Sequence, residues 1–189
     1  LTLGDSDTGL SVSANLLVGG TSTGAIDLGD ATLADGATLT VGTGAANAIN
    51  LDAVTGTGAG AASNLTVNTT GVLAVAEAIG TDVGVVTLTQ SGGATFTGAV
   101  DATTVTLTDT TGAIEFDGAL TATTLGTAAQ DYALNLDGGA TITNAVTLSN
   151  TGTARIGDGA DVSAFNGGLT ATAPSSISAA GTVKADGGT

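Results

Sequence analysis

Residues 94–105 read ATFTGAVDATTV and residues 114–125 read IEFDGALTATTL, so the second segment repeats the first after 20 positions. Six of the twelve positions are identical, and every apolar position of the first segment stays apolar in the second. Two further steps of 20 reach Leu134-Asn135-Leu136-Asp137-Gly138 and Ala154-Arg155-Ile156-Gly157. A repeat of this length predicts a fold in which equivalent coils are stacked along one axis.

The repeat continues toward the N-terminus with a looser spacing. One family of apolar–polar–apolar triplets is followed by Gly or Asp at Leu1–Leu3, Ile26–Leu28 and Ile49–Leu51, with Leu73–Val75 in the place of the next member. A second family lies between these triplets, at Leu16–Gly19, Leu39–Gly42, Leu65–Asn68, Val86–Leu88, Val105–Leu107 and Val146–Leu148. Together the two families indicate about eight coils of roughly 20–25 residues.

Alternation with a period of two places successive side chains on opposite faces of a strand, and the Gly, Asp, Asn and Ser residues between triplets suit short turns. We therefore predict an all-β fold, a parallel β-solenoid in which residues 1–189 form one domain. A β-sandwich is the alternative, but sandwich strands do not require similar residues at equal spacing. The solenoid predicts a ladder of Phe96, Phe116, Leu136 and Ile156, with Thr side chains pointing outward.

The composition fits a narrow, regular core. The chain has 31 Gly, one Pro, 2% aromatic residues and no Cys, Met, Trp or His, so Val, Leu, Ile and Ala must fill the interior. Its mean hydropathy is +0.42 and 10% of its residues are charged, which argues against disorder. The net charge of −15, with only Arg155 and Lys184 as bases, excludes a nucleic-acid binder and argues against docking on anionic lipid.

The sequence offers little for catalysis, and we predict that the protein is not an enzyme. The chain has no His and no Cys, so it lacks the usual acid–base residue and the usual nucleophilic thiol. Asp158 and Asp161 could be read as a hydrolase pair, but acids in a solvated turn are the simpler interpretation. The glycine-rich segment Gly56–Gly60 lacks the Lys-Ser/Thr of a phosphate loop and is expected to be a turn insertion.

Metal binding is the strongest chemical candidate. Acidic residues recur just after the apolar triplets, at Asp5, Asp30, Asp52, Asp117, Asp137 and Asp158. In stacked coils, some of these carboxylates come within about 5 Å of one another, and calcium prefers such oxygen clusters. Aspartate also suits turns through its own side-chain hydrogen bonds. We therefore expect no cofactor, with calcium as the alternative.

Threonine recurs at the middle of several triplets, as at Thr87, Thr106 and Thr147. Outward rows of threonine can order water, as they do in ice-binding solenoids. Threonine is also an ordinary outward residue of a strand, and we favour that interpretation here.

The segment Gly98–Leu107 and its repeats resemble the Gly/Ala/Thr-rich repeats of filamentous-haemagglutinin-like and autotransporter-type bacterial surface proteins. The resemblance covers the whole chain and rests on composition and period. It implies a right-handed β-helix, whereas the residues alone leave the handedness open. It also implies secretion, an extracellular or cell-surface location, and a role in adhesion, matrix or fibres. It transfers no site residues.

We therefore expect a mature subunit or a segment of a longer repeat protein that serves as a fibre subunit or stalk. Neither end shows a capping element, so the end coils are expected to pair with another copy or to continue into more of the same solenoid. The expected partner is the chain itself, with no nucleic acid and no membrane insertion. An adhesin segment that binds a surface glycan, and a calcium-dependent surface-layer or matrix protein, are the alternatives. Phe96, Phe116, Tyr132 and Phe165 are too few and scattered for an aromatic glycan platform.

Overall fold

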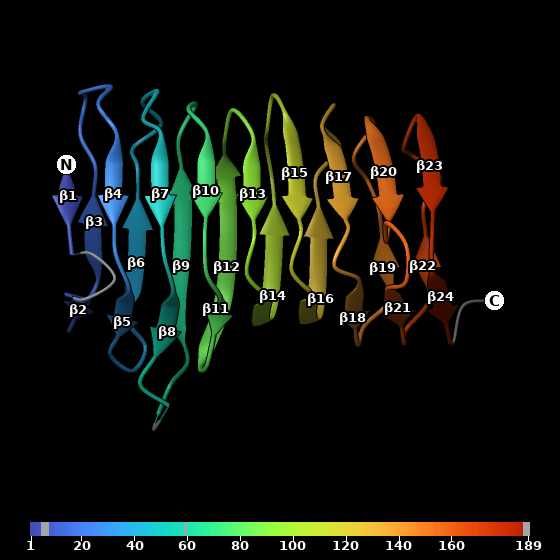
Figure 1. Ribbon diagram of the computed structural model, residues 1–189, viewed down its shortest axis with the longest axis horizontal. Helices are drawn as coiled ribbons and strands as arrows, with labels where there is room; N and C mark the ends of the chain where they lie inside the picture. Colours follow the sequence, from blue (N-terminus) through green and yellow to red (C-terminus); the bar gives the residue numbers. More distant parts are fainter. Residues whose placement is uncertain (5–7, 59, 187–189) are drawn as a thin grey trace.

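The short triplets of β-branched and aliphatic residues form strands throughout the computed structural model, which describes residues 1–4, 8–58 and 60–186. Every pair of neighbouring strands is parallel, and each strand lies beside its equivalent one coil away (Figure 1). One sheet holds nine strands, one per coil, so the solenoid has about nine turns. The predicted parallel β-solenoid is thus confirmed, with one turn more than predicted. The structure is also consistent with the right-handed β-helix that the resemblance implies.

The first face of the solenoid is this nine-stranded sheet. Its strands are β1 (Thr2–Leu3), β4 (Ile26–Leu28), β7 (Ile49–Leu51), β10 (Leu73–Val75), β13 (Ala94–Phe96), β15 (Ala113–Phe116), β17 (Ala133–Leu136), β20 (Thr153–Ile156) and β23 (Ser176–Ala179). All of these strands except β23 correspond to the first family of triplets and the 20-residue repeats predicted from the sequence, including Leu73–Val75 in the fourth coil.

The second face follows the first in each coil. It consists of β2 (Leu10–Val12), β5 (Ala31–Leu33), β8 (Val54–Gly56), β11 (Ile79–Gly80), the first halves of β14 (Val100–Leu107) and β16 (Leu120–Thr127), then β18 (Ala140–Ile142), β21 (Val162–Phe165) and β24 (Thr182–Ala185).

The third face carries most of the second family of triplets. It consists of β3 (Leu16–Val18), β6 (Thr38–Val41), β9 (Ser63–Asn68), β12 (Val83–Gln90) and the second halves of β14 and β16. The pair β19 (Val146–Thr147) and β22 (Leu169–Thr170) continues it, with Thr127 of β16 bonded to the backbone of 147 and 149. Because β14 and β16 pass around the corner without interruption, they join the second and third faces into one sheet of 13 strands.

The core consists of continuous ladders of buried side chains. Phe96 pairs with Phe116, Phe116 with Leu136 and Leu136 with Ile156, as the 20-residue repeat predicts. The two phenyl rings stack with their centroids 4.6 Å apart and an angle of 6° between their planes. Each inner side chain of a ladder packs against the coils on both sides of its own, so the core runs along the solenoid without a break.

A second, polar ladder fills the corner between the third and first faces. Its buried side chains are Asn47, Thr69, Ser91, Thr110 and Asn150. Asn47 Nδ2 donates to the carbonyl oxygens of Ser22 and Gly24 at 2.7 and 2.6 Å, and the hydroxyls of Ser91 and Thr110 lie 2.8 Å apart. Strands end at this corner, so their carbonyl groups lack a sheet partner and these side chains supply one.

Tyr132, the one tyrosine of the chain, occupies the corner between the third and first faces just before β17. Its side chain is 1% exposed, and its hydroxyl donates to the carbonyl oxygen of Leu107 at 3.3 Å. Burial raises the pKa of Tyr132 to about 12. The unfolded chain ionises near pH 10, so we expect about 2–3 kcal/mol of stability to be present below pH 10 and lost as the pH rises toward 12.

Denaturant unfolding at intervals between pH 8 and 12 would measure this loss, and tyrosinate absorbance would report the pKa directly, because no other tyrosine or tryptophan interferes. In a Tyr132→Phe control the decline above pH 10 should be absent. A wild-type titration near pH 10 would contradict the expectation.

Candidate functional site

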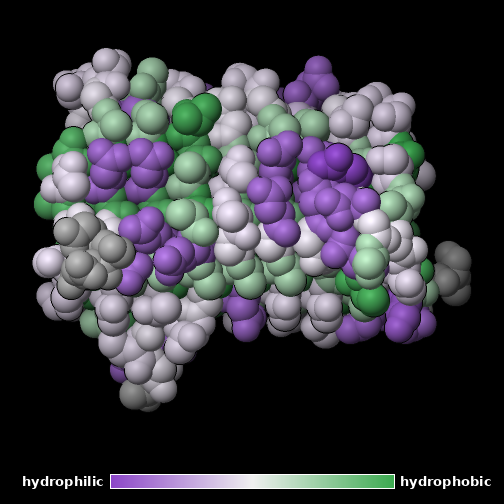
Figure 2. All heavy atoms as spheres, in the orientation of Figure 1, coloured by the Kyte–Doolittle hydropathy of each residue, from purple (hydrophilic) through white to green (hydrophobic). Residues whose placement is uncertain are grey.

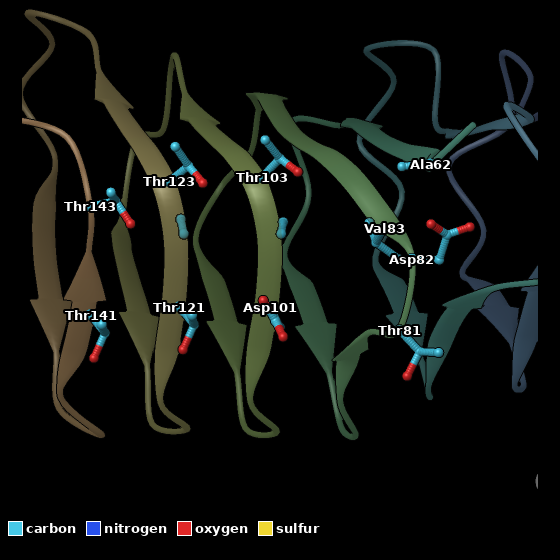
Figure 3. Close-up of a pocket in the computed structure, with 12 residues that line it drawn as sticks. Ala62, Thr81, Asp82, Val83, Asp101, Thr103, Thr121, Thr123, Thr141 and Thr143 are labelled. Carbon is cyan, nitrogen blue, oxygen red and sulfur yellow. The ribbon is translucent and has the colours of Figure 1, made fainter. Parts of the chain in front are cut away.

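A trough lies over the corner where β14 and β16 pass from the second face to the third. Figure 3 shows Thr103, Thr123 and Thr143 along one side of it and Asp101, Thr121 and Thr141 along the other. The trough has a volume of about 330 Å³ and runs across three coils, parallel to the solenoid axis.

The local sequence explains why a row of residues lines each side of the trough. The three coils read Asp101-Ala102-Thr103, Thr121-Ala122-Thr123 and Thr141-Ile142-Thr143, and their middle residues are buried while the flanking ones are exposed. Alternation along a strand sends the two flanking side chains outward together. The repeat then stacks equivalent residues in successive coils, which produces two parallel rows of hydroxyl groups.

One end of the trough is closed by Ala62 and the Thr81-Asp82-Val83 turn. Thr81 and Asp82 have φ values of 49° and 65°, a region that residues other than glycine rarely adopt. The turn is held by the preceding coil, because Gly56 N and Ser63 N donate to the carbonyl oxygens of Thr81 and Asp82 at 2.7 and 3.0 Å. Gly58 N also donates to Asp82 Oδ2 at 3.0 Å.

The glycine-rich segment predicted as a turn insertion contributes to this closure. Gly56 ends β8, and the following residues connect it to β9, with residue 59 lying outside the described part of the chain. A side chain at Gly56 would bring its Cβ within 2.5 Å of the Asp82 carbonyl oxygen, so the close approach requires glycine.

The trough can form hydrogen bonds but offers no stacking surface. Its hydroxyl groups both donate and accept, as polyhydroxylated ligands require, and Asp82 and Asp101 add negative charge near its closed end. No aromatic residue is among those that line it. The site was not predicted from the sequence, because threonine at an outward strand position is common. The repeat of the pattern Thr-x-Thr after 20 residues was the available signal.

The acidic residues predicted as calcium ligands do not form one row. Asp5 lies outside the described residues. Asp30 and Asp52 are offset by one position, because Leu28 pairs with Leu51, and Asp30 Oδ1 accepts a hydrogen bond from Ala53 N at 3.2 Å. Within the described ranges, no three Asp or Glu side chains come close enough to hold a metal ion together.

Asp117 and Asp137 do occupy equivalent positions, because each follows a residue of the Phe116–Leu136 pair. Asp137 is 9% exposed and already has a cationic partner, since Arg155 Nε donates to its Oδ1 at 2.6 Å and Arg155 Nη2 donates to Oδ2. The hydrogen bond and charge of Asp137 raise the pKa of Arg155 further above its ordinary value. Arg155 therefore supplies a cationic partner at one of the candidate calcium positions.

Asp158, the last predicted ligand, lies beside Asp161. Asp161 Oδ2 accepts a hydrogen bond from Asp158 N at 3.3 Å. A hydrogen bond and charge repulsion from Asp161 raise the pKa of the Asp158 carboxyl. Asp158 is exposed and Asp161 is half-buried.

Hydrophilic side chains gather in two places on the first face, over β4 and β7 and over β15, β17 and β20 (Figure 2). The first contains the hydrogen bond from Asn50 to Asp27. In the second, Asn135 Nδ2 donates to Glu115 at 3.2 Å, and Asn135 pairs with Arg155 of the next coil. The 20-residue repeat already placed Glu115, Asn135 and Arg155 side by side, but the Arg155–Asp137 ion pair was not predicted.

No family model matches the chain, and no curated protein or solved structure is similar enough to count as a match. Among the residues that the structure describes there is no helix long and apolar enough to cross a bilayer.

Proposed function

We propose that this protein is an extracellular structural element, a stiff β-solenoid that serves as a fibre subunit or stalk at a cell surface or in a matrix. One observation carries the proposal: the first sheet continues through all nine coils, from β1 to β23, without an interruption. The extracellular location rests on the resemblance to bacterial surface repeats.

Stiffness follows from how each coil is held. An inner coil has hydrogen-bonded neighbours on both sides along its faces, and the apolar ladders and the polar corner ladder add buried side-chain contacts. Nine coils at the strand spacing of about 4.8 Å make a rod of roughly 40 Å. Bending such a rod would open hydrogen bonds in several sheets at once, so a mechanical role suits it.

Both end coils of the described chain present surfaces that another coil could cover. Leu1 of the first coil is 62% exposed, and Ile177 and Val183 of the last are 47% and 41% exposed. The outer edges of β1 and β23 have no strand partner among the described residues. Open edges pair readily with further strands. We propose that each end coil packs on a further coil, supplied by another copy or by the same polypeptide.

Negative-stain electron microscopy of the purified chain, with calcium and with a chelator, tests this proposal. Fibres one solenoid wide are expected, because head-to-tail packing buries the end ladders. Fibres that disappear in chelator would show that calcium bridges the aspartates between coils. Discrete short rods in both conditions would contradict head-to-tail assembly.

An adhesin segment is the second candidate, and the threonine trough is the observation that favours it. Two rows of hydroxyl groups with carboxylates at one end fit a polyhydroxylated ligand such as a surface glycan. Without an aromatic platform each site would bind weakly, so an adhesin of this kind would depend on many repeats. Discrete rods in the microscope would favour this candidate over the fibre subunit.

A further inference from the structure

The third face differs from the rest of the molecule in its charge. The chain has 17 acidic residues and a net charge of −15. On the described strands of the third face, none of the outward positions from β6 to β16 is charged. These positions include Thr38, Thr40, Asn64, Thr66, Val85, Thr87, Thr104, Thr106, Thr124 and Gly126. We call this surface the threonine face.

The other two faces carry charges on their strands. Asp27, Glu115 and Arg155 lie on the first face, and Asp101 and Lys184 lie on the second. Most of the remaining acids lie in the turns between strands. The charge of this acidic protein is thus distributed over two faces and the turns, and the threonine face is left neutral.

The threonine face is also regular. Thr40 pairs with Thr66, Thr66 with Thr87 and Thr87 with Thr106, which gives an unbroken row of four threonines. Leu17, which is 60% exposed, pairs with Thr40 and extends the row by one apolar residue. Neighbouring side chains of the row are about 4.8 Å apart, the spacing of the coils.

We propose that the threonine face is a lateral interface, on which a second copy of this chain docks through the same face. Two molecules of charge −15 repel one another, and the repulsion is strongest where acidic turns or the first faces approach. Contact through the threonine faces keeps the carboxylates of both copies at the rim, where salt and solvent screen them. Among the three faces, this one allows the closest approach at the lowest electrostatic cost.

The geometry suits a self-complementary contact. Both copies carry rows with the same repeat, so the side chains of one row can lie between those of the other, with methyl groups in contact and hydroxyl groups hydrogen-bonded. Identical faces related by a two-fold axis make a closed pair. Thr87 lies near the middle of the row and would be close to its own equivalent across that axis.

The size of the face sets the strength of the contact. Five strands at the coil spacing, each contributing three or four residues, cover roughly 24 Å by 13 Å, or about 300 Å² per copy. A stable dimer commonly buries about 800 Å² per partner. Single chains should therefore associate weakly, and rods aligned in fibres should bundle because many such contacts act together. The bundling, though not the pairwise contact, rests on the proposed function.

Because the chain has no cysteine, a single introduced thiol reports this contact cleanly. Thr87→Cys places it on the threonine face, and Thr95→Cys is the matched control, an outward, half-buried threonine on β13 of the first face. Under mild oxidation at low salt, Thr87→Cys should form disulfide-linked dimers about tenfold faster than Thr95→Cys, and the ratio should fall as salt screens the repulsion between first faces. Equal rates at low salt would overturn the proposal.

A second substitution separates a specific contact from thiol accessibility. Thr106→Glu in the Thr87→Cys chain brings like charges together across the interface and should return cross-linking to the rate of the Thr95→Cys control, whereas Thr106→Ser should not. Circular dichroism checks that both variants are folded. Fast cross-linking that Thr106→Glu leaves unchanged would overturn the inference. Failure of the wild type to form fibres would count against head-to-tail assembly alone, because cross-linking is measured on separate chains.

Discussion

Replacing Phe116 by alanine is expected to lower the free energy of unfolding by about 3–5 kcal/mol, as in other buried Phe→Ala substitutions. The Phe116 side chain is fully buried, its ring stacks on that of Phe96, and Leu136 follows it in the ladder. Alanine would leave a cavity in the middle of the stack, and the coils on either side cannot collapse into it without breaking their sheet hydrogen bonds. Urea unfolding followed by circular dichroism measures the loss.

Phe116→Leu is the matched control. Leu136 already occupies the equivalent position one coil later, so the ladder accepts leucine, and we expect a loss below about 1.5 kcal/mol. If Phe116→Ala also lost less than this, the coils would have closed around the cavity, and the rigidity on which the mechanical proposal depends would be in doubt.

The parts of the fold that could be predicted from the sequence are those with large apolar residues at a fixed spacing. The Phe96–Phe116–Leu136–Ile156 ladder and the Leu-Thr-Val triplets of the third face are correct in register. A solenoid stacks equivalent residues directly, so its repeat carries contact information that a sandwich sequence lacks.

The second face was not predicted because one of the two inward positions is small in several of its coils. Ala31, Gly56, Ala102 and Ala122 each leave their strand with a single large inward residue, so the apolar–polar–apolar pattern is weak there. The polar corner ladder was missed for a related reason. Asn, Thr and Ser also mark ordinary turns, and the sequence alone cannot tell a buried turn residue from a solvated one.

The acidic residues show the limit of the repeat as a guide to a site. The loose spacing of the early coils conceals the offset of one residue between Asp30 and Asp52, and this offset separates two carboxylates that the pattern placed together. The repeat does bring Asp117 and Asp137 to equivalent positions, but the Arg155 side chain reaches Asp137 from the next coil. The repeat period gives the position of each residue within its coil, but it does not show how far a side chain extends toward a neighbouring coil.

Stacked glycines at the turns leave no room for a side chain, and Gly118→Ala is expected to destabilise the protein by about 1–3 kcal/mol, toward the upper end of that range. A Cβ atom at Gly118 would lie 2.3 Å from the carbonyl oxygen of Gly98 and 2.4 Å from its carbonyl carbon. Gly138 is packed in the same way against Gly118 in the following coil. Since the obstructing atoms belong to the backbone, relief requires movement of a whole turn, and the sheets on both sides resist it.

Gly20→Ala isolates the effect of crowding in this comparison. No atom lies within 4 Å of a Cβ at Gly20, so alanine there should be neutral or should stabilise the protein by about 0.4–1 kcal/mol, because it restricts the unfolded chain. Unfolding of the two variants and the wild type in guanidinium chloride gives the difference directly. If Gly118→Ala were as stable as Gly20→Ala, the turns would have room to move apart. The rod would then be compliant along its axis, and a role as a stiff stalk would lose its physical basis.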